Sequence, residues 1–167
     1  MIVGDSTLKI LTYGLPDFEK EHARFIVSKK YGFKFFAVAG CLVSERLIDS
    51  IESQNKIVFA AMENKFGKQW YSKFNAEVEE VFKIEERIRG VVWKKPFMIF
   101  RQKELEKEGN GLFLIINPMS HKNLYEVKAY GWGTWNGTNA QIIYYRLIVD
   151  LTKNKVIQVN EKQEKFY

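Results

Sequence analysis

The spacing of apolar residues changes once along the chain, and this change limits the folds that the chain can adopt. In the first half, apolar side chains recur at helical spacing, as in helices that bury one face. From residue 91 onward, apolar and polar residues alternate with a period of two, which is typical of strands. This order predicts an α+β fold, with N-terminal helices packed on one face of a curved, mainly antiparallel sheet formed largely by the C-terminal half.

The first half predicts two strands and three helices. Residues 8–13 have the β-branched and aromatic character of a short strand, and the nearly continuous apolar run 33–41 predicts a strand in the sheet interior. Asp17 and Ser44 are suitable N-cap residues, and Gly32 suits a left-handed C-cap. The expected helices cover residues 17–32, 44–67 and 70–90.

The second half predicts a series of strands joined by short connections, which is typical of an antiparallel meander. Pro96 cannot donate a hydrogen bond to a neighbouring strand, so the first of these strands is expected to be an edge strand or to be broken there. The expected strands cover residues 91–101, 112–117, 124–134, 140–151 and 156–160.

The length and composition are those of one globular domain. The chain has 167 residues, of which 46% are hydrophobic, so we expect a single α+β domain over residues 1–167. No stretch has the roughly 18 apolar residues that cross a bilayer, so no transmembrane segment is expected. The N-terminal residues lack a basic segment followed by an apolar run, which favours the cytoplasm over export, although an exported mature chain would look the same.

The dipeptide Asn136-Gly137 is a strong signal for a hairpin turn. A two-residue loop would place Glu126 and Lys128 on the face that carries the apolar row of the following strand. A three-residue loop, residues 135–137, reverses the faces and sets Glu126 opposite Arg146, so we expect this loop. Gly131 and Gly133 then lie on the core-facing side, where a glycine permits strong twist or close approach of another backbone.

The same pairing gathers aromatic side chains on the opposite face, and this face is the predicted binding site. It would contact a partner protein, a planar ligand or unstacked bases. Alternatively, a helix or the terminal segment covers it as a second core layer, and the solvent exposure of Trp132 distinguishes the two. The predicted binding residues are Tyr130, Trp132, Ile142 and Tyr144, with Lys128 and Arg146 at the rim.

Catalytic motifs are not recognisable in the sequence. Cys41 is the only cysteine and is expected to be a buried small hydrophobe, while His22 and His121 are far apart, so we expect no metal site and no cofactor. The net charge of +6 comes from scattered residues, which favours a protein or small-molecule partner over nucleic acid. The sequence therefore favours a non-catalytic binding or protein-interaction module. The alternatives are a small enzyme with an acid or base in a cavity between sheet and helices and, less favoured, a nucleic-acid-binding protein. The oligomeric state is not indicated.

Overall fold

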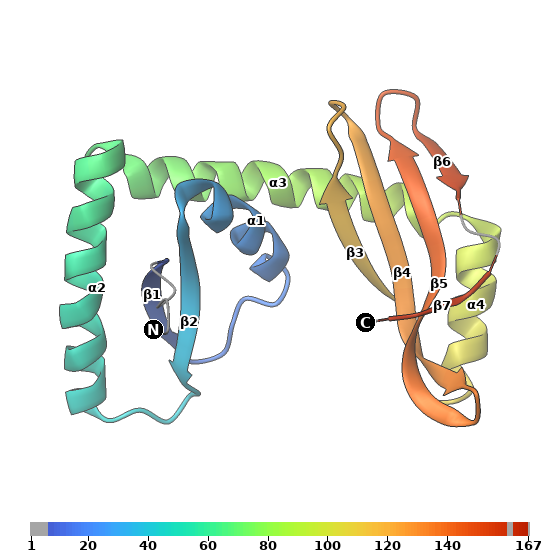
Figure 1. The fold of residues 1–167 in the computed structure, drawn as a ribbon, viewed down its shortest axis with the longest axis horizontal. Helices are drawn as coiled ribbons and strands as arrows, with labels where there is room; N and C mark the ends of the chain where they lie inside the picture. The colour runs from blue at the N-terminus through green and yellow to red at the C-terminus, as the bar shows by residue number, and fades with distance from the viewer. Residues whose placement is uncertain (1–6, 160–161, 167) are drawn as a thin grey trace, which may run out of the picture. The chain divides into compact units, whose positions relative to one another are not determined.

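The computed structural model describes residues 7–159 and 162–166. The class is α+β, as the sequence predicts (Figure 1). The chain forms two compact units, Met1–Lys83 and Ile84–Tyr167. Each unit has a hydrophobic cluster of its own. The expectation of one domain over residues 1–167 stays a prediction.

The first unit is a small βαβ arrangement covered by helices. Its two strands are parallel and α1 connects them, as parallel neighbours require. The core is rich in aromatic rings, with the centroids of Phe33 and Phe74 5.2 Å apart. Its elements are β1 (Leu8–Tyr13), α1 (Glu21–Tyr31), β2 (Phe33–Ala39), α2 (Glu45–Phe66) and the N-terminal part of α3 (Trp70–Val92).

Four of the expected helix ends are confirmed, including the end of α2 at Gly67 and the start of α3 at Trp70, and two are wrong. Gly32 ends α1 with φ 78°, and the Ser44 hydroxyl oxygen accepts a hydrogen bond from the Leu47 N–H at 3.4 Å at the start of α2. Asp17 does not cap α1, because its carbonyl accepts the Lys20 N–H in a preceding turn. The third helix continues past Gly90 to Val92.

Strand β2 does not lie in the interior of a sheet, so that prediction is wrong. Among the described residues, β2 pairs with β1 alone, and Phe36 and Val38 are exposed. At the other edge of β1, the Asn55 side chain of α2 binds the backbone of Leu11. The Leu11 N–H donates to Asn55 Oδ1 at 2.8 Å, and Asn55 Nδ2 donates to the Leu11 carbonyl at 2.9 Å. A continuous apolar run is equally compatible with a strand that leaves half of its apolar residues in water.

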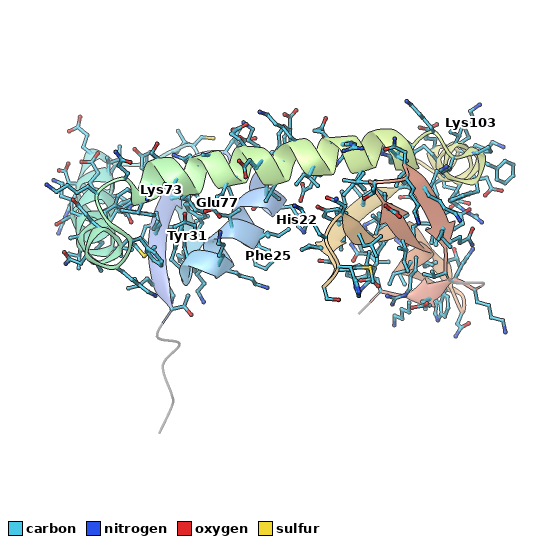
Figure 2. All side chains as sticks on the ribbon, turned by 90° about the horizontal axis from the view of Figure 1, so that it is seen from above. His22, Phe25, Tyr31, Lys73, Glu77 and Lys103 are labelled. Carbon is cyan, nitrogen blue, oxygen red and sulfur yellow. The ribbon has the colours of Figure 1, made fainter. Side chains whose placement is uncertain are left out.

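Hydrogen bonds from two residues of α1 to one carboxylate of α3 join these helices within the first unit. Figure 2 shows Tyr31 and Glu77 facing one another, and the Tyr31 hydroxyl donates to the Glu77 carboxylate at 3.0 Å. Lys30 donates to the same carboxylate at 2.6 Å. The Lys30 hydrogen bond holds the pKa of Glu77 below its ordinary value, while burial and the Glu77 carboxylate raise the pKa of Tyr31.

The second unit is an antiparallel meander with helices on one face (Figure 1). The strand order is β3-β4-β5-β6, and β7 also pairs with β5. The predicted meander is thus confirmed, while Asn160, the predicted end of the last strand, lies outside the described residues. Besides the end of α3, the unit contains α4 (Pro96–Glu106), β3 (Phe113–Pro118), β4 (Leu124–Trp135), β5 (Thr138–Asp150), β6 (Lys155–Gln158) and β7 (Glu164–Lys165).

The strand predicted for residues 91–101 is wrong, because Pro96 begins helix α4. A proline suits the first turn of a helix, where its fixed φ is already helical and its missing N–H is not needed. Met98 and Leu105 of α4 are buried in the same cluster as Ile88 of α3 and the inner side chains of the sheet. In the part of the chain that the structure describes, no helix is both long and apolar enough to cross a bilayer.

Candidate binding site on the C-terminal sheet

The hairpin between β4 and β5 turns over two residues, so the predicted three-residue loop is wrong. Trp135 pairs with Thr138, and Asn136 and Gly137 have φ values of 49° and 79°. Positive φ at both central residues matches the right-handed twist of the paired strands. Asparagine and glycine are the residues that tolerate this geometry best.

A β-bulge in β5 supplies the odd residue that the prediction had placed in the loop. Ala129 pairs with Tyr145 and Tyr130 pairs with Ile143, so Tyr144 is the extra residue. On the side of the bulge away from the turn, the side chains of β4 and β5 face the sides that the sequence predicts. Val127 and Ala129 are fully buried, whereas Glu126 and Lys128 lie on the outer face. Lys128, rather than Glu126, lies directly opposite Arg146.

The bulge divides the predicted site residues between two faces. Tyr130, Trp132, Lys128 and Arg146 share the outer face, and Trp132 is 43% exposed, so its side chain is not covered as core. Ile142 and Tyr144 are only 2% and 6% exposed and belong to the core cluster, so their predicted place on the binding face is wrong. A binding role for the four outer residues stays a prediction.

Tyr144 faces the helical side of the sheet. The Arg101 guanidinium of α4 lies over its ring, 5.0 Å from the centroid, and burial raises the pKa of its hydroxyl. The next residue, Tyr145, also faces α4, because its hydroxyl donates to the Phe97 carbonyl at 3.4 Å. Consecutive side chains on one side are characteristic of a bulge, and here they bury two aromatic rings against one helix.

Gly131 and Gly133 lie on the core-facing side, as the sequence predicts. A Cβ atom at Gly131 would collide with the Gly111 carbonyl oxygen of the loop before β3, and one at Gly133 would collide with the Tyr144 hydroxyl. The two glycines of the sequence YGWGTW are therefore explained by packing against neighbouring groups on the inner face.

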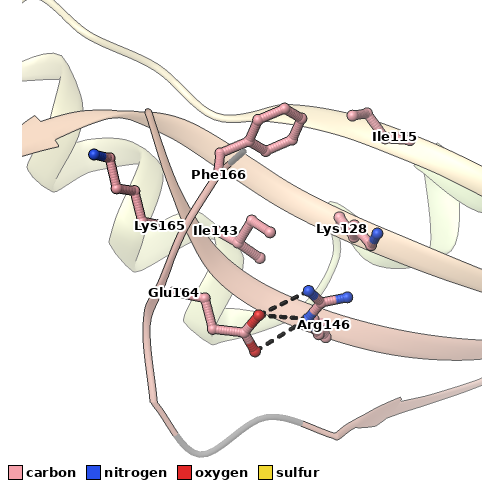
Figure 3. Close-up of a pocket in the computed structure, with 7 residues that line it drawn as sticks. All are labelled: Ile115, Lys128, Ile143, Arg146, Glu164, Lys165 and Phe166. Carbon is pink, nitrogen blue, oxygen red and sulfur yellow. Dashed lines mark hydrogen bonds and ion pairs between the residues drawn. The ribbon is translucent and has the colours of Figure 1, made fainter. Parts of the chain in front are cut away.

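The last described segment of the chain lies along the free edge of β5 (Figure 3). Glu164 pairs with Ile143 and Lys165 pairs with Ile142, and the Phe166 N–H donates to the Gln141 carbonyl at 2.9 Å. Because alternate residues of a strand share a face, Glu164 and Phe166 both reach over the outer face of the sheet.

Two contacts hold this segment on the outer face. The Arg146 guanidinium donates from Nε to Glu164 Oε1 at 3.0 Å and from Nη2 to Oε2 at 2.7 Å, and Arg146 also contacts Glu126 at 3.3 Å. The hydrogen bond from Arg146 holds the pKa of Glu164 below its ordinary value. The Phe166 ring lies against Tyr130, with centroids 4.8 Å apart, and Tyr130 also contacts Phe113 at 5.7 Å.

A hollow of about 380 Å³ opens between this segment and the outer face of the sheet. Ile115 and Ile143 provide apolar surface, and Lys128 and Arg146 provide positive charge (Figure 3). Such a surface suits a ligand that joins an apolar part to an anionic group. The remaining lining residues are Glu164, Lys165 and Phe166.

A second hollow, of about 430 Å³, lies in the first unit beside the loop between β1 and α1. Its charged lining residues carry both signs, with Asp17 and Glu21 facing the same space as Arg24 and Lys34. Cys41 is exposed, not buried as expected. Within residues 7–159 and 162–166, no cluster of three histidine, cysteine or acidic side chains could hold a metal ion.

Sequence reasoning missed Ile115, Ile143 and the segment with Glu164 and Phe166. One available signal was the alternation in this segment, which places an acidic and an aromatic side chain two positions apart. A scan against protein-family models and searches of curated proteins and of solved structures found no match to this chain. Function is therefore inferred from the chemistry of this face.

Proposed function

We propose that the protein is a non-catalytic binding module that uses the outer face of its C-terminal sheet. The ligand joins an anionic group to an apolar or aromatic part. Ile115 and Ile143 contact the apolar part, and Lys128 and Arg146 bind the anionic group. Support comes from the hollow, which combines these four side chains in one space.

The observation that carries this proposal is the direct pairing of Lys128 with Arg146 across β4 and β5. Like charges directly opposite one another on a strand pair are destabilising. Here two carboxylates offset the two cations: Glu126 lies 3.3 Å from Arg146 and 3.8 Å from Lys128, and Glu164 lies 2.7 Å from Arg146. Two cations side by side at an apolar hollow are suited to binding a negatively charged group, which would take the place of a carboxylate of the chain.

The aromatic residues at the turn end of β4 extend the same face. Trp132 is half-exposed, and Tyr130 is partly covered by Phe166. Exposed aromatic rings that contribute large contact area are typical of binding hot spots. We expect Trp132→Ala to weaken binding of a ligand that reaches the turn end. Its effect on the melting temperature should be small, because little of the side chain is packed in the core.

Two small probes of equal shape and opposite charge test the proposal. The backbone amide signals of Ile115, Lys128 and Ile143 are followed by NMR while 3-phenylpropionate or 3-phenylpropylamine is added to the wild-type chain. We expect saturable shifts with the carboxylate and none with the amine. Lys128→Gln should weaken the response to the carboxylate, and Lys155→Gln, on the exposed part of β6, is the matched control. Equal responses to both probes, or no response to either, would contradict the proposal.

A further inference from the structure

The contacts of residues 164–166 have the form of a bound peptide. Two residues add to the edge of β5 through the backbone, one carboxylate binds Arg146, and one ring lies on Tyr130. Recognition by strand addition uses these same parts, since main-chain hydrogen bonds provide affinity and side chains on one face provide specificity. The spacing follows from strand geometry, because residues i and i+2 share a face.

The surface that receives this segment is formed by other parts of the sheet. Arg146 contacts Glu126 of the neighbouring strand, and Tyr130 contacts Phe113 of β3. Backbone pairing with β4 fixes Ile143 and Arg146 on the outer face. A peptide of similar chemistry would thus find Arg146, Tyr130 and the β5 edge already in place.

The segment uses only part of this surface. Its regular pairing covers two residues, and the hollow of about 380 Å³ remains beside it. Ile115 and Ile143 border that space, so a longer or bulkier peptide gains apolar contacts that residues 164–166 do not make. Covalent attachment gives the segment a high effective concentration, which offsets its small contact area.

Resting on the proposed function, we propose that the partner is an extended peptide with a carboxylate and, two residues later, an aromatic ring, and that residues 164–166 occupy its place. The partner binds by displacing this segment from the β5 edge. Its carboxylate then pairs with Arg146 and its ring with Tyr130. Binding in the wild type is therefore weakened by competition within the chain.

Fluorescence anisotropy with a labelled peptide KQEKF, the sequence of residues 162–166, tests this competition. The full-length variant Glu164→Ala/Phe166→Ala releases the segment, and Lys155→Ala is the control. A segment bound for about 90% of the time raises the apparent Kd of a competitor about tenfold. We therefore expect the released variant to bind KQEKF at least ~10-fold more tightly than the wild type or the control. Adding Arg146→Met should abolish binding, and the peptide KQAKA should not bind.

Equal affinity of the wild type and the released variant, or equal binding of KQEKF and KQAKA, would overturn the peptide inference. If 3-phenylpropionate still binds selectively, the proposed function stands and only this inference fails. Circular dichroism checks that the double variant folds, and the single variant Phe166→Ala repeats the test if it does not. A wild-type dimer that the released variant cannot form would identify a second copy as the occupant and would also overturn the inference.

Discussion

Replacing glycine by alanine should have opposite effects on stability at two positions of the second unit. At Gly131, an added methyl group meets the Gly111 carbonyl oxygen and lies 3.3 Å from a Leu105 methyl carbon. At Gly90, on the exposed side of α3, the space around the added methyl group is open. The first change overpacks an occupied site, while the second removes a flexible residue from a helix interior.

The size of each stability change depends on which neighbouring atoms the added methyl group displaces. Overpacking costs about 1–3 kcal/mol, and the neighbour at Gly131 is backbone. The adjacent Leu112 N–H is held by a 2.8 Å hydrogen bond to Gln102, so we expect Gly131→Ala to lower the free energy of unfolding by about 2–3 kcal/mol. For a chain of this size, that loss lowers Tm by roughly 4–12 °C. Gly90→Ala should raise the free energy of unfolding by about 0.5–1 kcal/mol.

Urea denaturation followed by far-UV circular dichroism measures both changes. The m-value should stay constant, because neither variant alters the surface exposed on unfolding. A neutral Gly131→Ala variant would show that the Gly111 loop moves without cost and that close backbone approach does not explain this glycine. Destabilisation by Gly90→Ala would refute the assignment of open space and unstrained helical backbone at that position.

Two further measurements test the core of the first unit and the ion pair of the second. Phe74→Ala should lower the free energy of unfolding by about 3–5 kcal/mol, because Phe74 is fully buried among aromatic rings. The control Phe100→Ala, at an exposed position, should change the free energy of unfolding by less than about 0.5 kcal/mol. Because Arg146 lowers the pKa of Glu164, the stability that this pair contributes is present above the ordinary pKa of glutamate and is lost as the pH falls through the lowered value. An NMR titration of the Glu164 carboxyl should give a midpoint below that of an exposed glutamate, and Arg146→Met should raise this midpoint.

Local signals predicted the elements whose causes are local. Ser44 and Gly32 mark helix ends because a side-chain cap and a left-handed residue act within one turn. The strands after residue 112 were predictable because alternation extends over most of each strand. Helix α4 was not, since an apolar run as short as 97–100 fits helix and strand equally, and Pro96 is suitable for the start of a helix as well as for a strand edge.

The binding face was predictable in part, because two different irregularities produce the same alternation. An odd residue in the turn and an odd residue in the strand both turn Val127 inward and Lys128 outward. The two arrangements assign different faces only to the residues of β5 between the bulge and the turn. Ile142 and Tyr144 lie in this stretch. The contact of Glu164 with Arg146 joins residues 18 positions apart, and the alternation around Glu164 does not indicate which residue is its partner.

The bulge at Tyr144 also makes the hairpin tip a unit that protein engineers could exchange. Insertion of one residue normally turns the rest of a strand inside out, but here that change of phase is already present between Ile143 and Tyr145. A grafted tip that begins after Ala129 and ends before Tyr144 needs to keep its own inward and outward sides in order, a glycine at position 131 beside the Gly111 carbonyl oxygen, and an apolar residue at the buried position 142. We expect such chimeras to retain the pairing of residues 124–129 with residues 145–150.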